Sequence, residues 1–154
     1  MIRNRTALVL ICALAGFAAG CGDDDDDGGG GGGDAPTKAE FIERGDTICA
    51  EGDRAVEQEF KRKFGQGDDA SKAQLVKFTE ASLVPNLKDQ SAQLRALPAP
   101  EGDGDTVTAI WDALDDGIAS LEDDPAQVLE EDPASFEKAN KLARAYGFKE
   151  CGDA

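Results

Sequence analysis

Apolar residues recur at helical spacing along most of the chain after residue 36, and no segment shows the strict alternation of a strand. The clearest stripe predicts a helix that begins near Asp105 or Thr106, because its apolar positions are separated by steps of one, three or four. These positions are Val107, Ile110, Trp111, Leu114, Ile118 and Leu121. We expect Trp111 to anchor the core, with an exposed partner contact as the alternative.

A long first helix is predicted between Thr37 and Phe64. Thr37 followed by Glu40 three residues later is a capping box, in which each side chain accepts a hydrogen bond from the other residue's backbone N–H. Gly65 follows Phe64, and glycine commonly ends a helix.

Three small residues fall on one side of this helix and leave a notch there. They are Gly45, Cys49 and Gly52. A glycine inside a helix costs about 1 kcal/mol relative to alanine. We expect the close approach of another helix, or of the C-terminal tail, to compensate for this cost.

A second helix is predicted over residues 71–97, and it contains Pro85. Its apolar positions are Leu75, Phe78, Leu83, Leu87, Leu94 and Leu97. Proline lacks a backbone N–H and clashes with the preceding turn, so we expect a kink or a break near residues 81–84.

Two Asp-Pro pairs mark the starts of the last helical segments. Asp124-Pro125 is expected to open a short segment and Asp132-Pro133 the final helix, because Asp caps a helix and Pro suits its first position. Gly147 is expected to end the final helix. Four amphipathic helices joined by short polar links predict an all-α, up-and-down bundle of about four helices, one of them with a proline kink.

The first twenty residues have the pattern of a secretory signal peptide. Arg3 and Arg5 precede an uncharged, mostly apolar run over residues 6–20 that ends in small residues. A membrane-spanning helix needs about 20 apolar residues, so this run is short for a permanent span. We predict a signal over residues 1–20, with a retained membrane helix as the alternative.

The end of this run resembles the lipobox of bacterial lipoproteins. It reads Ala18-Ala19-Gly20-Cys21, although the family favours Leu where Ala18 stands. In that family the Cys sulfur receives a diacylglyceryl group, and a peptidase cuts just before the Cys. The resemblance implies that Cys21 is lipidated and that the protein is anchored on the extracytoplasmic face of the cell membrane, where two acyl chains suffice for stable binding.

Residues 22–35 consist mainly of a run of Asp and a run of Gly. They include no apolar residue larger than Ala, so they cannot bury enough surface to offset chain entropy. We predict a disordered tether over residues 21–35 and a helical bundle domain over residues 36–154. Weak cation binding by the Asp run over residues 23–27 is the alternative interpretation.

The cysteines bear on how the bundle is closed. Cys12 leaves with the signal, and the resemblance assigns Cys21 to lipid, which leaves Cys49 and Cys151. An even pair in an exported domain normally forms a disulfide. The last helix of an antiparallel four-helix bundle returns toward the start of the first, so the tail can reach the notch. We predict a disulfide between Cys49 and Cys151, with a redox-active or metal-binding pair as the alternative.

Three further segments resemble small helical lipoproteins of high-GC Gram-positive bacteria. They are residues 46–51, 97–103 and 145–152, which read DTICAE, LPAPEGD and AYGFKECG. That group has no established activity. The resemblance therefore implies the helical fold and the cysteine pairing, and it assigns no catalytic or binding residue.

Composition restricts the chemistry. The 154-residue chain has no His and a net charge of −16, which argues against His-based catalysis, His-ligated zinc and nucleic-acid binding. No carboxylate falls on an inner helix face, and we interpret Asp46, Asp53, Asp112 and Asp116 as solvated. We predict no catalytic residue, no metal ligand, no cofactor and no nucleic-acid partner.

Two local clusters invite other interpretations. Residues 101–105 read EGDGD, like the start of a calcium loop, but Thr106 and Asp112 stand where that loop needs Gly and Glu. The basic residues 61–63 are a candidate contact for anionic lipid or a cell-wall polymer, although cations also suit the C-terminal end of a helix.

The function we expect is non-enzymatic: an exported, membrane-anchored lipoprotein that binds or scaffolds an envelope protein or a cell-wall polymer. The alternative is a lipoprotein that binds a small molecule or a metal in a cavity beside Pro85. A hydrolase without His is a third possibility, disfavoured because no general base is visible.

Overall fold

The computed structural model describes residues 35–66, 70–130 and 134–152. Every regular element in these ranges is helical, which confirms the predicted all-α class. The elements are α1 (Lys38–Phe64), α2 (Lys72–Phe78), η1 (Thr79–Leu83), α3 (Val84–Ala96), α4 (Gly104–Asp123), η2 (Pro125–Leu129), η3 (Ala134–Phe136), α5 (Glu137–Tyr146) and η4 (Glu150–Gly152).

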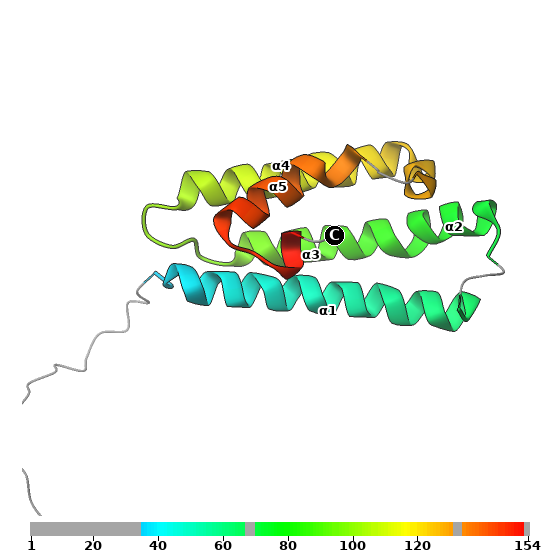
Figure 1. Ribbon diagram of the computed structural model, residues 1–154, viewed down its shortest axis with the longest axis horizontal. Helices are drawn as coiled ribbons and strands as arrows, with labels where there is room; N and C mark the ends of the chain where they lie inside the picture. The colour runs from blue at the N-terminus through cyan, green and yellow to red at the C-terminus, as the bar shows by residue number, and fades with distance from the viewer. Residues whose placement is uncertain (1–34, 67–69, 131–133, 153–154) are drawn as a thin grey trace, which may run out of the picture. The chain divides into compact units, whose positions relative to one another are not determined.

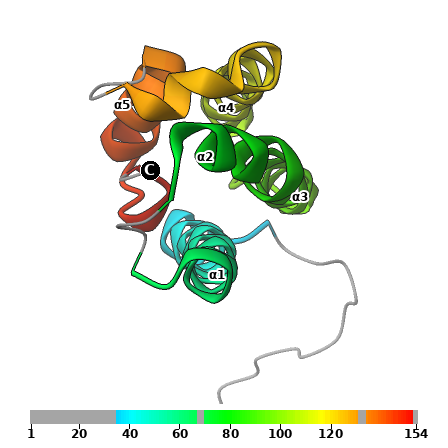
Figure 2. The same cartoon turned by 90° about the vertical axis from the view of Figure 1, so that its right-hand side faces the viewer.

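The helices form an up-and-down bundle. α3 packs between α1 and α4, and α4 in turn packs against α5 (Figure 1). Viewed from one end of the bundle, α1, α3, α4 and α5 surround a common centre (Figure 2). The short η4 contacts both α5 and α1, so the C-terminal segment completes the ring of elements.

Local signals in the sequence set most helix ends. Thr37 and Glu40 form the predicted capping box, and Gly65 follows α1 with a φ of 63°, a left-handed value that favours glycine. Asp124 caps η2 by accepting a hydrogen bond from the backbone N–H of Ala126. The predicted cap Asp132-Pro133 lies outside the described residues.

Pro85 changes the helical hydrogen bonding without ending the helix. Residues Thr79–Leu83 form a π-helical turn, in which the N–H of Val84 donates to the carbonyl of Thr79 five residues earlier. Pro85 has no N–H to donate to the carbonyl of Ala81, so the chain widens before the proline and then continues as α3. The disruption predicted near residues 81–84 is thus a π turn.

The core is built around four aromatic side chains. Phe41 is fully buried, and its ring centroid lies 6.4 Å from Trp111, 6.1 Å from Tyr146 and 5.9 Å from Phe148. Trp111 is 3% exposed, which confirms its predicted place in the core. These contacts join α1, α4 and the end of α5.

The glycine notch on α1 accommodates the tail and a neighbouring helix. A Cβ atom at Gly45 would come within 2.5 Å of the Phe148 ring, and a Cβ atom at Gly52 would overlap the side chain of Gln90. Only glycine permits both approaches at these distances, which supplies the compensation expected from the sequence.

Candidate ligand-binding cavity

A cavity of about 300 Å³ lies at the centre of the bundle, beside the π turn. Leu83 and Leu87, which flank Pro85, form part of its wall. The alternative function predicted from the sequence placed its cavity beside this proline, and that function stays a prediction. Residues that line it come from α1, η1, α3, α4, η2, η3, α5 and η4.

The wall of the cavity is mainly apolar. The lining apolar side chains are Leu83, Leu87, Leu94, Ile110, Trp111, Leu114, Leu121, Val128, Phe136, Ala139 and Ala143. Several of them, including Leu87, Leu114 and Phe136, are only half-buried. Val128 is 39% exposed and is the large apolar side chain most open to solvent among the described residues. A molecule that covered these groups would remove apolar surface from water, which is the main driving force for small-ligand binding.

The disulfide forms one side of the cavity. Cys49 of α1 and Cys151 of η4 are joined with a Cα–Cα distance of 5.3 Å, and both line the wall. Asp46 holds the same segment, because its carboxylate accepts hydrogen bonds from the backbone N–H groups of Lys149 at 3.1 Å and Cys151 at 3.2 Å. The C-terminal segment is therefore fixed to α1 by a covalent bond and by charge-assisted hydrogen bonds.

Two carboxylates lie at the edge of the cavity. Asp53 follows Cys49 by four residues and so lies on the same face of α1, whereas Glu150 directly precedes Cys151. Both residues are exposed to solvent. Desolvation by surrounding protein atoms, and then the nearby charge of Glu150, raise the pKa of Asp53.

The indole of Trp111 carries an unpaired donor. Its Nε1 is buried and has no hydrogen-bond partner among the described residues. Roughly 90% or more of buried polar groups in proteins are paired, and an unpaired one costs about 1–3 kcal/mol. Although Trp111 lines the cavity, its Nε1 atom is itself buried and has almost no surface open to a ligand there.

The four Asp residues interpreted as solvated have different environments. Asp112 pairs with Arg95 at 2.8 Å, and Asp116 lies 3.7 Å from the Lys138 ammonium; both acids remain exposed. Asp53 is exposed, as interpreted, and it also borders the cavity, whereas the interpretation was incomplete for Asp46, which is half-buried and anchors the tail. Periodicity missed both roles because the partner atoms lie about one hundred residues away in sequence.

The calcium-like segment has a structural role instead. Asp103 accepts a hydrogen bond from the Tyr146 hydroxyl at 2.6 Å, and Lys38 lies 4.0 Å from the centroid of the Tyr146 ring. Burial, followed by this hydrogen bond, raises the pKa of Tyr146. Within the described ranges, no three His, Cys, Asp or Glu side chains converge as metal ligands would.

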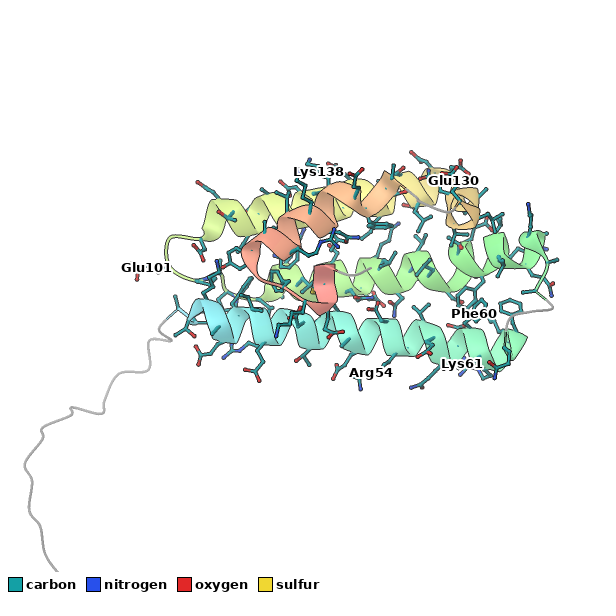
Figure 3. The ribbon with its side chains drawn as sticks, viewed as in Figure 1. Arg54, Phe60, Lys61, Glu101, Glu130 and Lys138 are labelled. Carbon is teal, nitrogen blue, oxygen red and sulfur yellow. A yellow bond between two sulfur atoms is a disulfide. The ribbon has the colours of Figure 1, made fainter. Side chains whose placement is uncertain are left out.

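The basic residues 61–63 lie in the last turn of α1, far along the helix from the cavity wall at Cys49. Lys61 pairs with Glu57 at 2.5 Å and Lys63 with Glu59 at 2.9 Å, so i,i+4 partners offset part of this positive charge. In Figure 3 the labelled side chains of Lys61, Arg54 and Lys138 point away from the bundle.

The predicted lipidation site Cys21, the signal over residues 1–20 and most of the tether over residues 21–35 lie outside the described residues. No helix in the described part of the chain is both long enough and apolar enough to cross a membrane. No protein-family model matches the sequence, and no curated protein or solved structure is similar to it at a significant level.

Proposed function

We propose that this protein is a membrane-anchored lipoprotein whose helical bundle binds a small, mainly apolar molecule without transforming it. The cavity at the centre of the bundle is the observation that carries the binding role. Its volume of about 300 Å³ is at the lower end of the roughly 300–1,000 Å³ found for ligand pockets. Its mainly apolar wall with a few polar groups has the composition that such pockets share.

Small-molecule binding is better supported than a scaffolding role. Docking to an envelope protein or a cell-wall polymer would favour a broad apolar or strongly basic surface. Among the described residues, Val128 is the exposed large apolar side chain, and it already belongs to the rim of the cavity. The basic residues 61–63 are partly neutralised by neighbouring acids.

The location of the protein is proposed from its N-terminal sequence. The apolar run before Cys21 resembles a lipoprotein signal, and a lipidated Cys21 would hold the domain at the extracytoplasmic face of the membrane. An exported domain is also where a disulfide such as Cys49–Cys151 persists. At the membrane surface a binding domain would meet apolar molecules that are scarce in bulk water.

Binding can be measured with Trp111, the only Trp in the sequence. N-phenyl-1-naphthylamine is a neutral apolar probe that accepts excitation energy from Trp and brightens in apolar surroundings. Titration of the purified full-length chain is expected to give saturable energy transfer from Trp111. An absence of saturable transfer would contradict the proposed function.

Matched variants locate the bound probe. Ala139→Leu fills the cavity from α5, and Val128→Phe fills its rim from an exposed position, so both should abolish the transfer. Ala92→Leu adds a leucine on an exposed face of α3, so it should leave the energy transfer unchanged. Any binding of the probe to residues 1–34 is the same in every variant, so it does not affect the comparison of energy transfer between them. Equal energy transfer in all three variants would show that the probe binds outside the cavity.

A further inference from the structure

We propose that the cavity selects molecules with an apolar body and a positively charged head, and that the head lies between Asp53 and Glu150. This inference rests on the proposed function, because it names the chemical class of ligand for the same cavity. It assigns a polar end to the cavity and so predicts how the bound molecule is oriented.

The fold brings the two carboxylates together from opposite ends of the domain. Asp53 lies one helical turn after Cys49 on α1, and Glu150 is the residue before Cys151. The disulfide joins these two positions across 102 residues of sequence and so gathers both acids at one side of the cavity. Desolvation, and after it the charge of Glu150, raise the pKa of Asp53.

Neither carboxylate forms an ion pair in the described part of the chain, although Arg54 and Lys149 line the same surface groove as Glu150. The ion pairs found there involve Glu57, Glu59, Asp112, Asp115, Asp116 and Glu122. Desolvation and mutual repulsion both oppose the charged form of Asp53, whose pKa is raised. A ligand cation between the two acids would remove the repulsion and supply the missing counter-charge.

The rest of the cavity excludes a second charged group. Beyond this edge the wall is formed largely by leucines and by the rings of Trp111 and Phe136, and its remaining polar residues, Gln90, Ser135 and Asn140, are neutral. Burial of an unpaired charge against such a wall is strongly unfavourable. The site therefore distinguishes the two ends of a molecule: the charge stays at the carboxylates and the apolar body enters the bundle.

Three probes with the same eight-carbon chain test the head-group preference. Octylammonium, octanol and octanoate are each used to displace N-phenyl-1-naphthylamine from the full-length chain at about 0.15 M salt, which screens distant charges. Octylammonium is expected to act at about one-tenth of the concentration of octanol, and octanoate to be the weakest. Equal displacement by all three would overturn the head-group inference and leave the proposed function standing.

A charge-matched pair of variants separates the local site from the net charge of −16. Asp53→Asn with Glu150→Gln is expected to abolish the advantage of octylammonium while octanol binds as before, which also shows that the cavity is intact. Asp89→Asn with Glu101→Gln removes the same charge from exposed positions outside the cavity and should preserve the advantage. An equal loss in both double variants would attribute the preference to bulk charge and overturn the inference.

No displacement by any probe, with no saturable transfer, would contradict the proposed function itself.

Discussion

Asp46 and Asp53 show how one residue type serves two purposes on the same helix. The carboxylate of Asp46 accepts backbone N–H groups from the tail, so its charge is used to hold structure. Asp53, two turns later, faces the rim of the cavity and the charge of Glu150. Asp46 therefore has hydrogen-bond partners within the fold. Asp53 forms no ion pair with the described residues, so its charge is available to a ligand.

The raised pKa of Asp53 gives a prediction about stability and pH. The folded protein binds a proton at Asp53 more tightly than the unfolded chain does, so ionisation of this group destabilises the fold as the pH rises above its ordinary pKa of 3.8. Asp53→Asn cannot ionise. The variant should therefore unfold at a higher temperature than the wild type near pH 7, and the gain should vanish below about pH 3.

Thermal unfolding followed by circular dichroism across this pH range measures the effect. Asp89→Asn is the control, because Asp89 is exposed on α3 and does not line the cavity. If this explanation holds, the unfolding temperature of Asp53→Asn does not stay above that of the wild type at about pH 3. An undiminished difference there would show that its cause is not the ionisation of Asp53.

At the scale of elements, the fold depends on a three-residue helix. η4 lies between α5 and α1 and closes the ring that the longer helices leave open. It is held by the disulfide, by Asp46 and by the packing of Phe148 over Gly45. A segment this short has no intrinsic helical stability, so its position comes from tertiary contacts such as these and the hydrogen bond that the Arg144 side chain donates to the carbonyl of Gly152.

Removal of the disulfide should therefore weaken both the fold and the cavity. Cys49→Ala with Cys151→Ala opens a loop of about 100 residues, and the unfolding free energy is expected to fall by about 2–5 kcal/mol. Urea denaturation of the wild type and of the double variant, with and without reductant, measures this change. Probe binding should weaken as well, since η4 carries part of the wall.

Reductant provides the internal control for this prediction. It should shift the wild-type denaturation midpoint toward that of the double variant and leave the variant itself unchanged. A double variant with the wild-type midpoint would show that Asp46 and Phe148 alone hold the tail.

For the whole molecule, we propose separate tasks for two parts of the chain. The helical bundle provides a cavity, and the N-terminal segment is proposed to keep that cavity at the membrane through Cys21. The net charge of −16 would attract cations and discourage contact with anionic lipid heads. This charge agrees with a domain that stands off the bilayer and receives a cationic amphiphile.

The proposed anchor predicts the location of the full chain. Cys21→Ser is expected to move the protein from the membrane fraction to the soluble fraction of a host that processes lipoproteins, because no acyl chain can be attached. Fractionation and the intact mass of the protein report the change. Cys12→Ser is the matched control and should leave the protein in the membrane fraction. An unaltered membrane fraction for Cys21→Ser would contradict a lipid anchor at this residue.

Most of the secondary structure was predictable because its signals are local. The capping box at Thr37, the stop at Gly65 and the effect of Pro85 each depend on neighbours within about one helical turn. The cavity beside Pro85 was anticipated only as an alternative, since its size depends on how eight elements pack. The acidic edge was missed, because no local pattern relates Asp53 to Glu150.

The sequence by itself determined the helices, their apolar faces and the cysteine pair available to close them, because these depend on spacing along one chain. Only the packing of the helices decided that a cavity remains between them, that the buried Nε1 of Trp111 lacks an acceptor and that two carboxylates lie at the edge of the cavity. The empty volume between packed helices and the pairing of charges depend on several surfaces that are distant in the sequence. No single stretch of sequence therefore contains this information.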